Sequence, residues 1–572
     1  MTLRSTSLRL MLLAATIWPA AAFATGLHSA TFEPEPSRDL PRDATAAPPA
    51  FRGRIPARAP AVARSHRAGA GTLAGRLFGI DSVALLVDGY VQDGWESAVA
   101  VNPADGSNAL VAFEEGWDFN PDIPLGSLRT GTSNWSSMAF PDGSGIYGGY
   151  PGQPWAAAGN AAGEFYASMI RQDLYPTDNT HTIMARTADG GVTFSKYFEM
   201  QRTTKQDRAM FDIDRTTARG GTTGTYDGRI YLCFDDWGPA GTGYVGSLLE
   251  ALAPGDTVPT EVVCSGTGTV PFRGTQFQPV AGTNDGQCFL VSNSIAGGGA
   301  TVFATFHELN DGGTTRQWTK GSLAWAPAGQ KLGATTHYGV NGHRIDERGS
   351  LVLDKSTGPR RGYLYFISNR NPNPSNYTLD QGDIYLSVSV DRAAHWTSAR
   401  LPLQEGKTQF FPMIDVDAQG WVHVAYYQNE TGFTDSGVLN ASQVEVYYTV
   451  SRDGGKSWAP PVRVNQVDHV LSMESPPLQL SSLDYDLLGD YMQLRATGTG
   501  SATAAYVGWT GYDQYRADDG VGTKKQRVYV TRVLAPDAPG ATPGSMGMTA
   551  AALAAAGALA LFRRRRRPQP AG

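Results

Sequence analysis

The chain has 572 residues, with 67 Gly, 35 Pro and 17% charged residues, against roughly 25% charged residues in an ordinary soluble domain. Its 41% hydrophobic and 10% aromatic content is enough for a large core, which excludes overall disorder and a collagen-like chain. The net charge of −6 has the wrong sign for a phosphate backbone, so nucleic acid is not an expected partner, and three Cys exclude a disulfide scaffold.

The N-terminus has the features of a secretory signal peptide over residues 1–24. Arg4 and Arg9 flank the start of a short apolar run, which ends in the small-x-small cleavage pattern Ala22-Phe23-Ala24. A buried N-terminal helix is the alternative, but the apolar run is short and ends in a protease-type site. Residues 25–76 are dense in Pro, Ala, Gly and Arg and show no strand or helix periodicity, so they are predicted to be a disordered linker.

Residues 77–533 contain an internal repeat of two extended runs joined by a turn. The first run is small and apolar, the turn contains Gly or Asp, and the second run alternates aromatic and apolar residues as strands do. Such self-similarity indicates a repeat architecture. The seven units begin at Glu96, Pro154, Arg208, Phe277, Gly349, Phe410 and Gly489.

This repeat predicts an all-β chain folded as a β-propeller of six or seven four-stranded blades. Seven blades are preferred because seven units can be counted. Radial repetition protects most strand edges, which suits a long chain of short strands. The last unit has only two clear strands, so an N-terminal strand around Ser82 to Val91 is expected to complete its sheet.

A second motif marks a turn in several units. Its pattern, [ST]-x-D-G-G-x-[ST]-[WF], occupies 187–194 and 451–458, and a worn copy without the glycines occupies 389–396. Asp accepts backbone N–H bonds across a tight hairpin, Gly permits positive φ, and the final aromatic residue is expected to be buried between blades. The residues assigned this structural role are Asp189, Phe194, Asp391, Trp396, Asp453 and Trp458.

The octad resembles the Asp-box, or BNR repeat, of the sialidase-like β-propeller superfamily, and the strand spacing extends the resemblance from Glu96 to about Val533. The resemblance implies blades whose first strands line a central channel, with the Asp-boxes on the face opposite the channel mouth. It also implies a site of three Arg for a substrate carboxylate, a Tyr nucleophile with a Glu, and an Asp acid/base.

The aromatic-Arg-Ile-Pro motif that usually supplies the first of these arginines is absent from the repeats. The one similar string, Arg54-Ile55-Pro56, follows Gly53 and lies in the predicted linker. Strict sialidase activity is therefore not predicted. Any site is expected at the starts of the first strands, where the same residue types can also join adjacent blades. The catalytic candidates are Tyr491, Asp490, Asp207, Arg208, Glu96 and Arg344.

No metal site and no cofactor are predicted. The nine His form no metal-spaced pair, and no EF-hand spacing is present. Calcium binding is the alternative, because Asp-rich loops supply the hard oxygen ligands that this ion prefers. Cys233, Cys264 and Cys288 are expected to be reduced and buried, with a single disulfide between two of them as the alternative.

The C-terminal segment, residues 546–572, consists of an apolar run and an Arg cluster, and a linker over 534–545 connects it to the body. The run is slightly shorter than the ~20 residues of a spanning helix, and the cluster would stay on the cytoplasmic side. The pattern resembles the sorting tails of Gram-negative bacteria, which a membrane protease trims during surface delivery. A permanent transmembrane anchor is the alternative.

These features together predict an exported protein at the outer surface of the cell or outside it, with the export machinery and a tail-processing protease as partners. The expected function is that of a sialidase-like propeller acting on extracellular glycans by glycoside hydrolase-type chemistry. The alternative is a non-catalytic surface propeller that binds glycan or protein, and a structural envelope protein is a third reading. A fold alone does not decide between these functions.

Overall fold

The computed structural model describes residues 65–66, 79–85, 94–102, 106–115, 126–131, 136–139, 152–172, 180–201, 206–215, 228–236, 246–252, 260–261, 274–281, 287–294, 301–309, 317–325, 349–370, 382–430, 442–465, 471–473, 491–497, 503–513 and 525–534. All of them belong to one compact unit, Arg52–Gly572. The predicted signal peptide and the predicted C-terminal segment lie outside the described residues.

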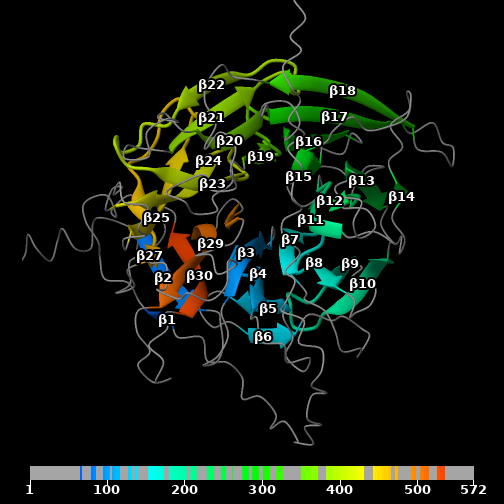
Figure 1. Ribbon diagram of the computed structural model, residues 1–572, viewed down its shortest axis with the longest axis horizontal. Coiled ribbons are helices and arrows are strands. Elements are labelled where there is room, and N and C mark those ends of the chain that lie inside the picture. The colour runs from blue at the N-terminus through cyan, green and yellow to red at the C-terminus, as the bar shows by residue number, and fades with distance from the viewer. Residues whose placement is uncertain are drawn as a thin grey trace, which may run out of the picture. The chain divides into compact units, whose positions relative to one another are not determined.

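The described part of the chain is all-β, as the repeat predicted, and is arranged in seven antiparallel sheets (Figure 1). In this part of the chain no helix is long and apolar enough to cross a membrane.

Six of these sheets each take consecutive strands from the chain. Sheet 1 contains β3 (Gly94–Val101), β4 (Ala109–Glu115), β5 (Gly126–Gly131) and β6 (Ser136–Ala139). Sheet 2 contains β7 (Gly152–Ala158), β8 (Phe165–Gln172), β9 (Thr180–Thr187) and β10 (Ser195–Gln201). Sheet 3 contains β11 (Gln206–Ile213), β12 (Ile230–Asp236), β13 (Gly246–Leu252) and β14 (Thr260–Glu261).

The next three sheets repeat the order. Sheet 4 contains β15 (Gly274–Ala281), β16 (Gln287–Ser294), β17 (Thr301–Leu309) and β18 (Gln317–Trp325). Sheet 5 contains β19 (Ser350–Leu353), β20 (Leu364–Arg370), β21 (Asp383–Ser389) and β22 (Thr397–Arg400). Sheet 6 contains β23 (Gln409–Val416), β24 (Val422–Asn429), β25 (Ser442–Ser451) and β26 (Val462–Arg463), and β27 (Leu471–Met473) also pairs with β25.

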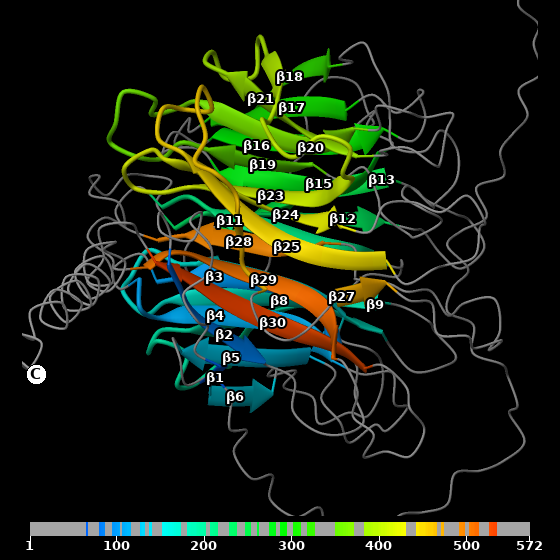
Figure 2. The same cartoon turned by 90° about the vertical axis from the view of Figure 1, so that its left-hand side faces the viewer.

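Sheet 7 joins the two ends of the repeat region. It has the order β1 (Ser65–His66), β2 (Gly79–Leu85), β30 (Lys525–Leu534), β29 (Thr503–Asp513) and β28 (Gln493–Ala496). Figure 2 shows β2, β30 and β29 side by side. The N-terminal strand that the sequence placed around Ser82 to Val91 is observed over Gly79–Leu85. The predicted linker differs at Ser65–His66, where the chain adds a short edge strand to β2.

Burial falls from the first strand of a sheet to the fourth, and this gradient follows the residue types. Every residue of β23 and of β24 is buried, because QFFPMIDV and VHVAYYQN carry large apolar side chains toward both faces. All four residues of β22, by contrast, are exposed, and its sequence TSAR is polar enough for a sheet edge. The first and second strands thus hold most of the contacts between sheets.

The cores between adjacent sheets differ in the size of their residues. Small residues such as Ala98 and Ala156 let sheets 1 and 2 approach closely, with Phe165 as the largest member of that core. Between sheets 6 and 7 the residues are larger, and Trp509 stacks on Tyr529 with ring centroids 4.3 Å apart. The size of the core residues therefore affects how closely these pairs of sheets pack.

The Asp-box turns have the local geometry that their sequence predicts. In sheet 6, Asp453 Oδ1 accepts hydrogen bonds from the backbone N–H groups of Lys456 and Ser457 at 3.0 and 2.9 Å, and Oδ2 accepts the Ser457 hydroxyl at 2.5 Å. Gly454 and Gly455 have φ of 77° and 94°. Asp189 makes the equivalent bonds in sheet 2. These side chains close a turn, which supports their structural assignment.

The worn copy in sheet 5 keeps this geometry without its glycines. Arg392 and Ala393 have φ of 60° and 68°, in the left-handed region that normally favours glycine. The backbone N–H of His395 donates to Asp391 Oδ1 at 2.8 Å, and its ring nitrogen lies 2.6 Å from Oδ2 in place of the usual hydroxyl. The Asp network therefore holds the turn against the backbone strain.

The aromatic residues that end the three octads are half-buried, whereas the sequence predicted full burial. Phe194 packs between sheets 1 and 2, Trp396 between sheets 4 and 5, and Trp458 between sheets 5 and 6. Each lies at the rim of its core because the turn that carries it is on the surface. Their expected location between sheets is observed, but one side of each ring meets solvent.

Two of the three cysteines are described. Cys233 and Cys288 are reduced and buried, and burial raises the pKa of the Cys288 thiol well above its usual value. Both therefore behave as small core side chains, as expected. Cys264 lies outside the described residues.

Candidate ligand site at the first strands

The first strands of consecutive sheets lie next to one another. Contacts join β3 to β7, β7 to β11, β11 to β15, β15 to β19, β19 to β23, β23 to β28 and β28 to β3. Side chains on these seven strands thus have access to a common space, which makes the strands the place to look for a ligand site.

Five of these strands contain a register shift near their start, which the sequence did not predict. The shifts fall in β3, β7, β11, β15 and β23, and Gln153 and Phe411, within two of them, have φ of 55° and 46°. A bulge turns its side chains away from regular alternation, and bulges are common beside active sites. Bulges have no simple composition signal, so periodicity alone could not reveal them.

Three of the predicted catalytic residues fall at these bulges. Glu96 lies within the irregular part of β3, and Arg208 lies within that of β11 directly after Asp207. Their side chains lie outside the described part of the structure, as do Asp490 and Arg344 altogether. The catalytic assignment of these five residues stays a prediction.

Tyr491 is described, and its surroundings are those of an interior residue. Only 3% of its surface is exposed, and its hydroxyl donates a 2.6 Å hydrogen bond to the carbonyl oxygen of Pro154 in the bulge of β7. Its ring meets Trp155 edge to face at 5.7 Å. These contacts join two sheets, which is the structural alternative that the sequence left open for Tyr491.

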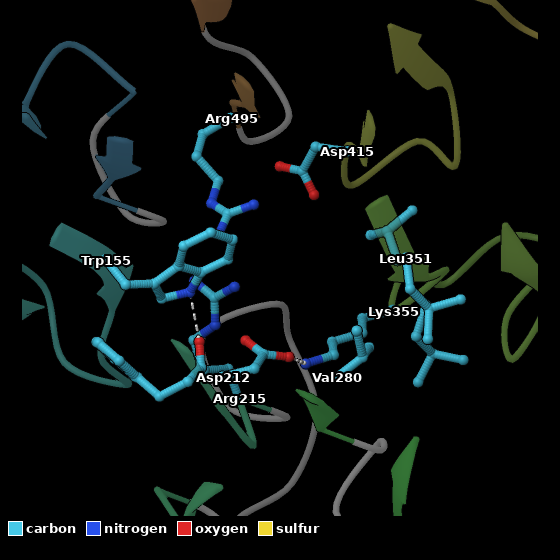
Figure 3. A pocket seen from close by; sticks show the side chains of 11 residues that line it. Trp155, Asp212, Arg215, Val280, Leu351, Lys355, Asp415 and Arg495 are labelled. Carbon is cyan, nitrogen blue, oxygen red and sulfur yellow. Dashed lines mark hydrogen bonds and ion pairs between the residues drawn. The ribbon is translucent and has the colours of Figure 1, made fainter. Parts of the chain in front are cut away.

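A pocket lies farther along the first strands. It is lined by residues of six sheets: Trp155, Phe211, Asp212, Arg215, Val280, Leu351, Val352, Leu353, Lys355, Asp415 and Arg495 (Figure 3). Most of these residues lie in the second half of a first strand or just after it. The first-strand bulges and the pocket are therefore two successive zones along the same strands.

A buried ion pair crosses this pocket between sheets 3 and 5. Lys355 Nζ lies 3.0 Å from Asp212 Oδ2, which also accepts the Ala281 backbone N–H at 2.8 Å. Burial would raise the pKa of Asp212, but the charges of Lys355 and Arg215 and these hydrogen bonds hold it below its usual value. Burial and Arg215 together lower the pKa of Lys355, against the opposing effect of Asp212. The carboxylate therefore remains ionised at neutral pH.

The opposite side of the pocket carries Arg495, Trp155 and Asp415. The Arg495 guanidinium lies 5.9 Å from the centre of the Trp155 ring, and the Trp155 indole N–H donates to the Phe211 carbonyl at 2.8 Å. Asp415 Oδ2 accepts the Ala496 backbone N–H at 2.9 Å. Figure 3 shows the Arg495 and Asp415 side chains reaching into the same space. This side therefore combines an aromatic face with one charge of each sign.

The catalytic candidates from the sequence did not include Asp212, Arg215, Lys355 or Asp415. The sequence did contain a signal that these residues share. Each is a charged residue at the end of an apolar first run or just after it, as in MFDIDR and MIDVD. A charge within an apolar run is ordinarily taken for a turn residue. The structure shows instead that these charged residues come from several sheets and line one pocket.

A Tyr–carboxylate pair of the kind implied by the resemblance occurs elsewhere among the described residues. The Tyr447 hydroxyl donates to Glu430 Oε1 at 2.6 Å, and Lys407 Nζ lies 3.6 Å from Glu430 Oε2. Burial, together with Glu430, raises the pKa of Tyr447. Since Tyr447 belongs to β25, the third strand of its sheet, this pair is separate from the pocket. A raised pKa also leaves the phenol protonated and weakly nucleophilic.

Within the part of the chain that the structure describes, no three His, Cys, Asp or Glu side chains form a group that could hold a metal ion.

Comparisons with known proteins give only distant structural similarities. No protein-family model and no curated protein sequence matches the chain. Among solved structures, a Hadza microbial sialidase is 15% identical over 58% of this chain and 63% of its own, with a TM-score of 0.35. The chain thus spans less than two thirds of that sialidase.

Two other similar structures are enzymes of different specificity. A Penicillium chrysogenum α-L-arabinanase complexed with arabinobiose is 10% identical, covering 83% of this chain and 98% of its own, with a TM-score of 0.35. An ulvan lyase of polysaccharide lyase family PL25 is 10% identical, covering 77% and 94%, with a TM-score of 0.39. All three proteins act on glycans, but at these TM-scores nothing about activity follows for this chain.

Proposed function

We propose that this chain is an exported seven-bladed β-propeller that acts on extracellular glycans, with its ligand bound where the first strands begin. The observation that carries this proposal is that five first strands have a bulge near their start. Glu96, Asp207 and Arg208 lie in or beside two of these bulges. Most glycoside hydrolases use a pair of carboxylates, and a guanidinium can bind an anionic group of a sugar bidentately.

The closed propeller is part of this proposal. The succession of first-strand contacts, ending with β28 beside β3, supports closure. The shared sheet of β2 and β30 supports it further, because the N-terminal end of the repeat region there pairs with the C-terminal end. In a ring closed in this way, neither the first nor the last sheet of the repeat region would lack a neighbouring sheet.

The proposal of export is based on the sequences of the two ends of the chain. Residues 1–24 would direct secretion, and residues 546–572 would deliver the protein to the surface through a tail-processing protease or anchor it in the membrane. The mass of the mature protein distinguishes these outcomes. Cleavage after Ala24 with loss of the tail supports sorting, whereas a retained tail supports an anchor.

Catalysis and binding are separated by one set of assays. The full mature chain is incubated with sialoside and neutral aryl-glycoside substrates and is tested in parallel for binding to a glycan array. Glu96→Gln, Asp207→Asn and Arg208→Gln are compared with Lys456→Gln, which removes one charge at an exposed Asp-box position.

Turnover that is lost in the bulge variants and kept in Lys456→Gln supports a glycosidase. Binding without turnover, weakened by the same variants, supports the non-catalytic alternative. The proposal fails if neither activity is found, or if all variants behave like the natural protein. Tyr491→Phe is added because a nucleophilic role predicts complete loss of turnover, whereas a structural role predicts turnover in the protein that remains folded.

A further inference from the structure

Four turns at one end of sheets 5 and 6 form a surface that we call the Asp-box face. They are 354–363, 390–396, 417–421 and 452–461, and all of their residues are described. Arg360 Nη2 joins three of these turns, since it donates to the carbonyl oxygens of Gly420 at 2.7 Å and Arg452 at 3.1 Å. The fourth turn begins directly after Ser389, which pairs with Leu364 at the end of the first turn.

The Asp-box face carries an excess of positive charge. With His395 taken as neutral, its charged residues with some exposure are five cations and two carboxylates: Arg360, Arg361, Arg392, Arg452, Lys456, Asp391 and Asp453. Asp354, Lys355 and Asp417 belong to the same turns but are buried. Since the whole chain has a net charge of −6, this face reverses the sign of the charge locally. The face is therefore suited to an anionic partner.

An exposed apolar side chain lies among these cations. Val390 is 63% exposed and is two positions from Arg392, and Val192 in the Asp-box turn of sheet 2 is 72% exposed. Single exposed apolar residues are common on protein surfaces, but cations beside apolar side chains are the combination that suits the headgroup boundary of a membrane. An acidic polysaccharide offers the charge without an apolar layer.

The chain also leaves sheet 7 at this end. Leu534 is the last residue of β30 and pairs with Thr503, the first residue of β29. The preceding strand, β28, ends at Ala496, whose backbone N–H donates to Asp415 beside the 417–421 turn at 2.9 Å. Residues 535–545 can extend over at most roughly 40 Å. The apolar run that follows them in the sequence is thus tethered to the end of the sheets that carries the Asp-box face.

We propose that the Asp-box face docks on an anionic phospholipid surface. The cations would bind lipid phosphates, and Val390 would enter the boundary between headgroups and acyl chains. The starts of the first strands, at the other end of the sheets, would then be directed away from the membrane. This inference rests on the proposed export of the chain but not on any activity toward glycans.

The test measures co-sedimentation of the full chain with vesicles of phosphatidylcholine alone or mixed with phosphatidylglycerol. The natural protein should bind the anionic vesicles more tightly, and higher ionic strength should weaken this preference. A triple variant, Arg392→Gln, Arg452→Gln and Lys456→Gln, should lose roughly tenfold or more in affinity for the anionic vesicles. The C-terminal segment with its Arg cluster is identical in both proteins, so the difference between them reports the Asp-box face alone.

The matched control removes three cations at the opposite ends of two strands. It combines Arg370→Gln at the end of β20 with Lys525→Gln and Arg527→Gln at the start of β30, and it should bind like the natural protein. Equal binding by the natural protein and the face variant overturns the inference, as does an equal loss in the control. Retention on heparin without a preference for anionic vesicles assigns the cations to an acidic polysaccharide and also overturns it.

Hydrogen exchange of the natural protein gives a second measurement that needs no variant. Anionic vesicles should slow exchange in 390–396 and 452–458, and exchange in 401–407, which connects β22 to β23 at the other end of the sheets, should stay unchanged. Slower exchange confined to 401–407, or no change in any of these segments, refutes the proposed docking.

Discussion

The hydroxyl of Tyr491 donates to the carbonyl of Pro154, 337 positions away in the chain, and thereby joins sheet 7 to the bulge of β7 in sheet 2. Ser168 repeats this relationship between sheets 2 and 3, since its hydroxyl donates to the carbonyl of Ala209 in the bulge of β11 at 2.7 Å. A bulge disrupts the ladder locally, and a buried carbonyl without a partner is costly. Hydroxyl groups from another sheet thus satisfy carbonyls at these bulges.

Tyr491→Phe is expected to lower the free energy of unfolding by about 1 to 3 kcal/mol, because it leaves the buried Pro154 carbonyl without this donor. Urea unfolding followed by tryptophan fluorescence measures the change. Tyr363→Phe is the matched control, since Tyr363 is partly buried and its hydroxyl makes no hydrogen bond among the described residues. Equal stability of the two variants would contradict the structural role of the Tyr491 hydroxyl.

Arg392→Gly is expected to raise the free energy of unfolding by up to about 1 kcal/mol, because a residue with a Cβ is strained at φ of 60°. The Asp391 bonds already hold the turn in the conformation that Gly would adopt freely. The comparison is Lys456→Gly, in an Asp-box position without positive φ, which should lower stability through the greater freedom of the unfolded chain. Matching losses in both variants would show that the turn in sheet 5 carries no strain.

The Asp-box of sheet 6 should make stability depend on pH in the acid range. Burial alone would raise the pKa of Asp453, but hydrogen bonds from Ser457, Ser451 and Lys456 lower it to about 2 from its usual 3.8. A lowered folded-state pKa means that the stabilisation is complete above about pH 4 and is lost as the pH falls toward 2. The Tm difference between the natural protein and Asp453→Asn should therefore shrink from pH 5 to pH 2.5. A constant difference would exclude this ionisation as the cause.

Trp458→Ala is expected to lower stability by roughly 2 to 3 kcal/mol, below the 3 to 5 kcal/mol typical of a buried aromatic residue, because one side of the ring meets solvent. The indole N–H also donates to the Gly455 carbonyl at 3.2 Å, and this bond is lost. Chemical denaturation of this variant and of Trp458→Phe separates the packing loss from the hydrogen-bond loss. Ligand binding should be unchanged in the folded fraction, and a selective loss of binding would contradict the structural assignment.

The sequence by itself determined the features that depend on neighbouring residues. Strand alternation predicted the all-β chain, and the octads predicted the turns at Asp189, Asp391 and Asp453, because an Asp closes such a turn using groups within four residues of itself. It also predicted that an N-terminal strand would complete the last sheet, since the final unit was short of strands.

Only the tertiary structure decided which charges meet. Asp212 and Lys355 are 143 positions apart, and Asp415 and Arg495 come from two further sheets. Nothing local distinguishes these residues from ordinary turn formers, because their pairing depends on the register of separate sheets and on where each first strand bulges. Bulges and inter-sheet distances follow from the packing of whole sheets, so the sequence predicted Tyr491 as a candidate but not the backbone carbonyl that its hydroxyl reaches.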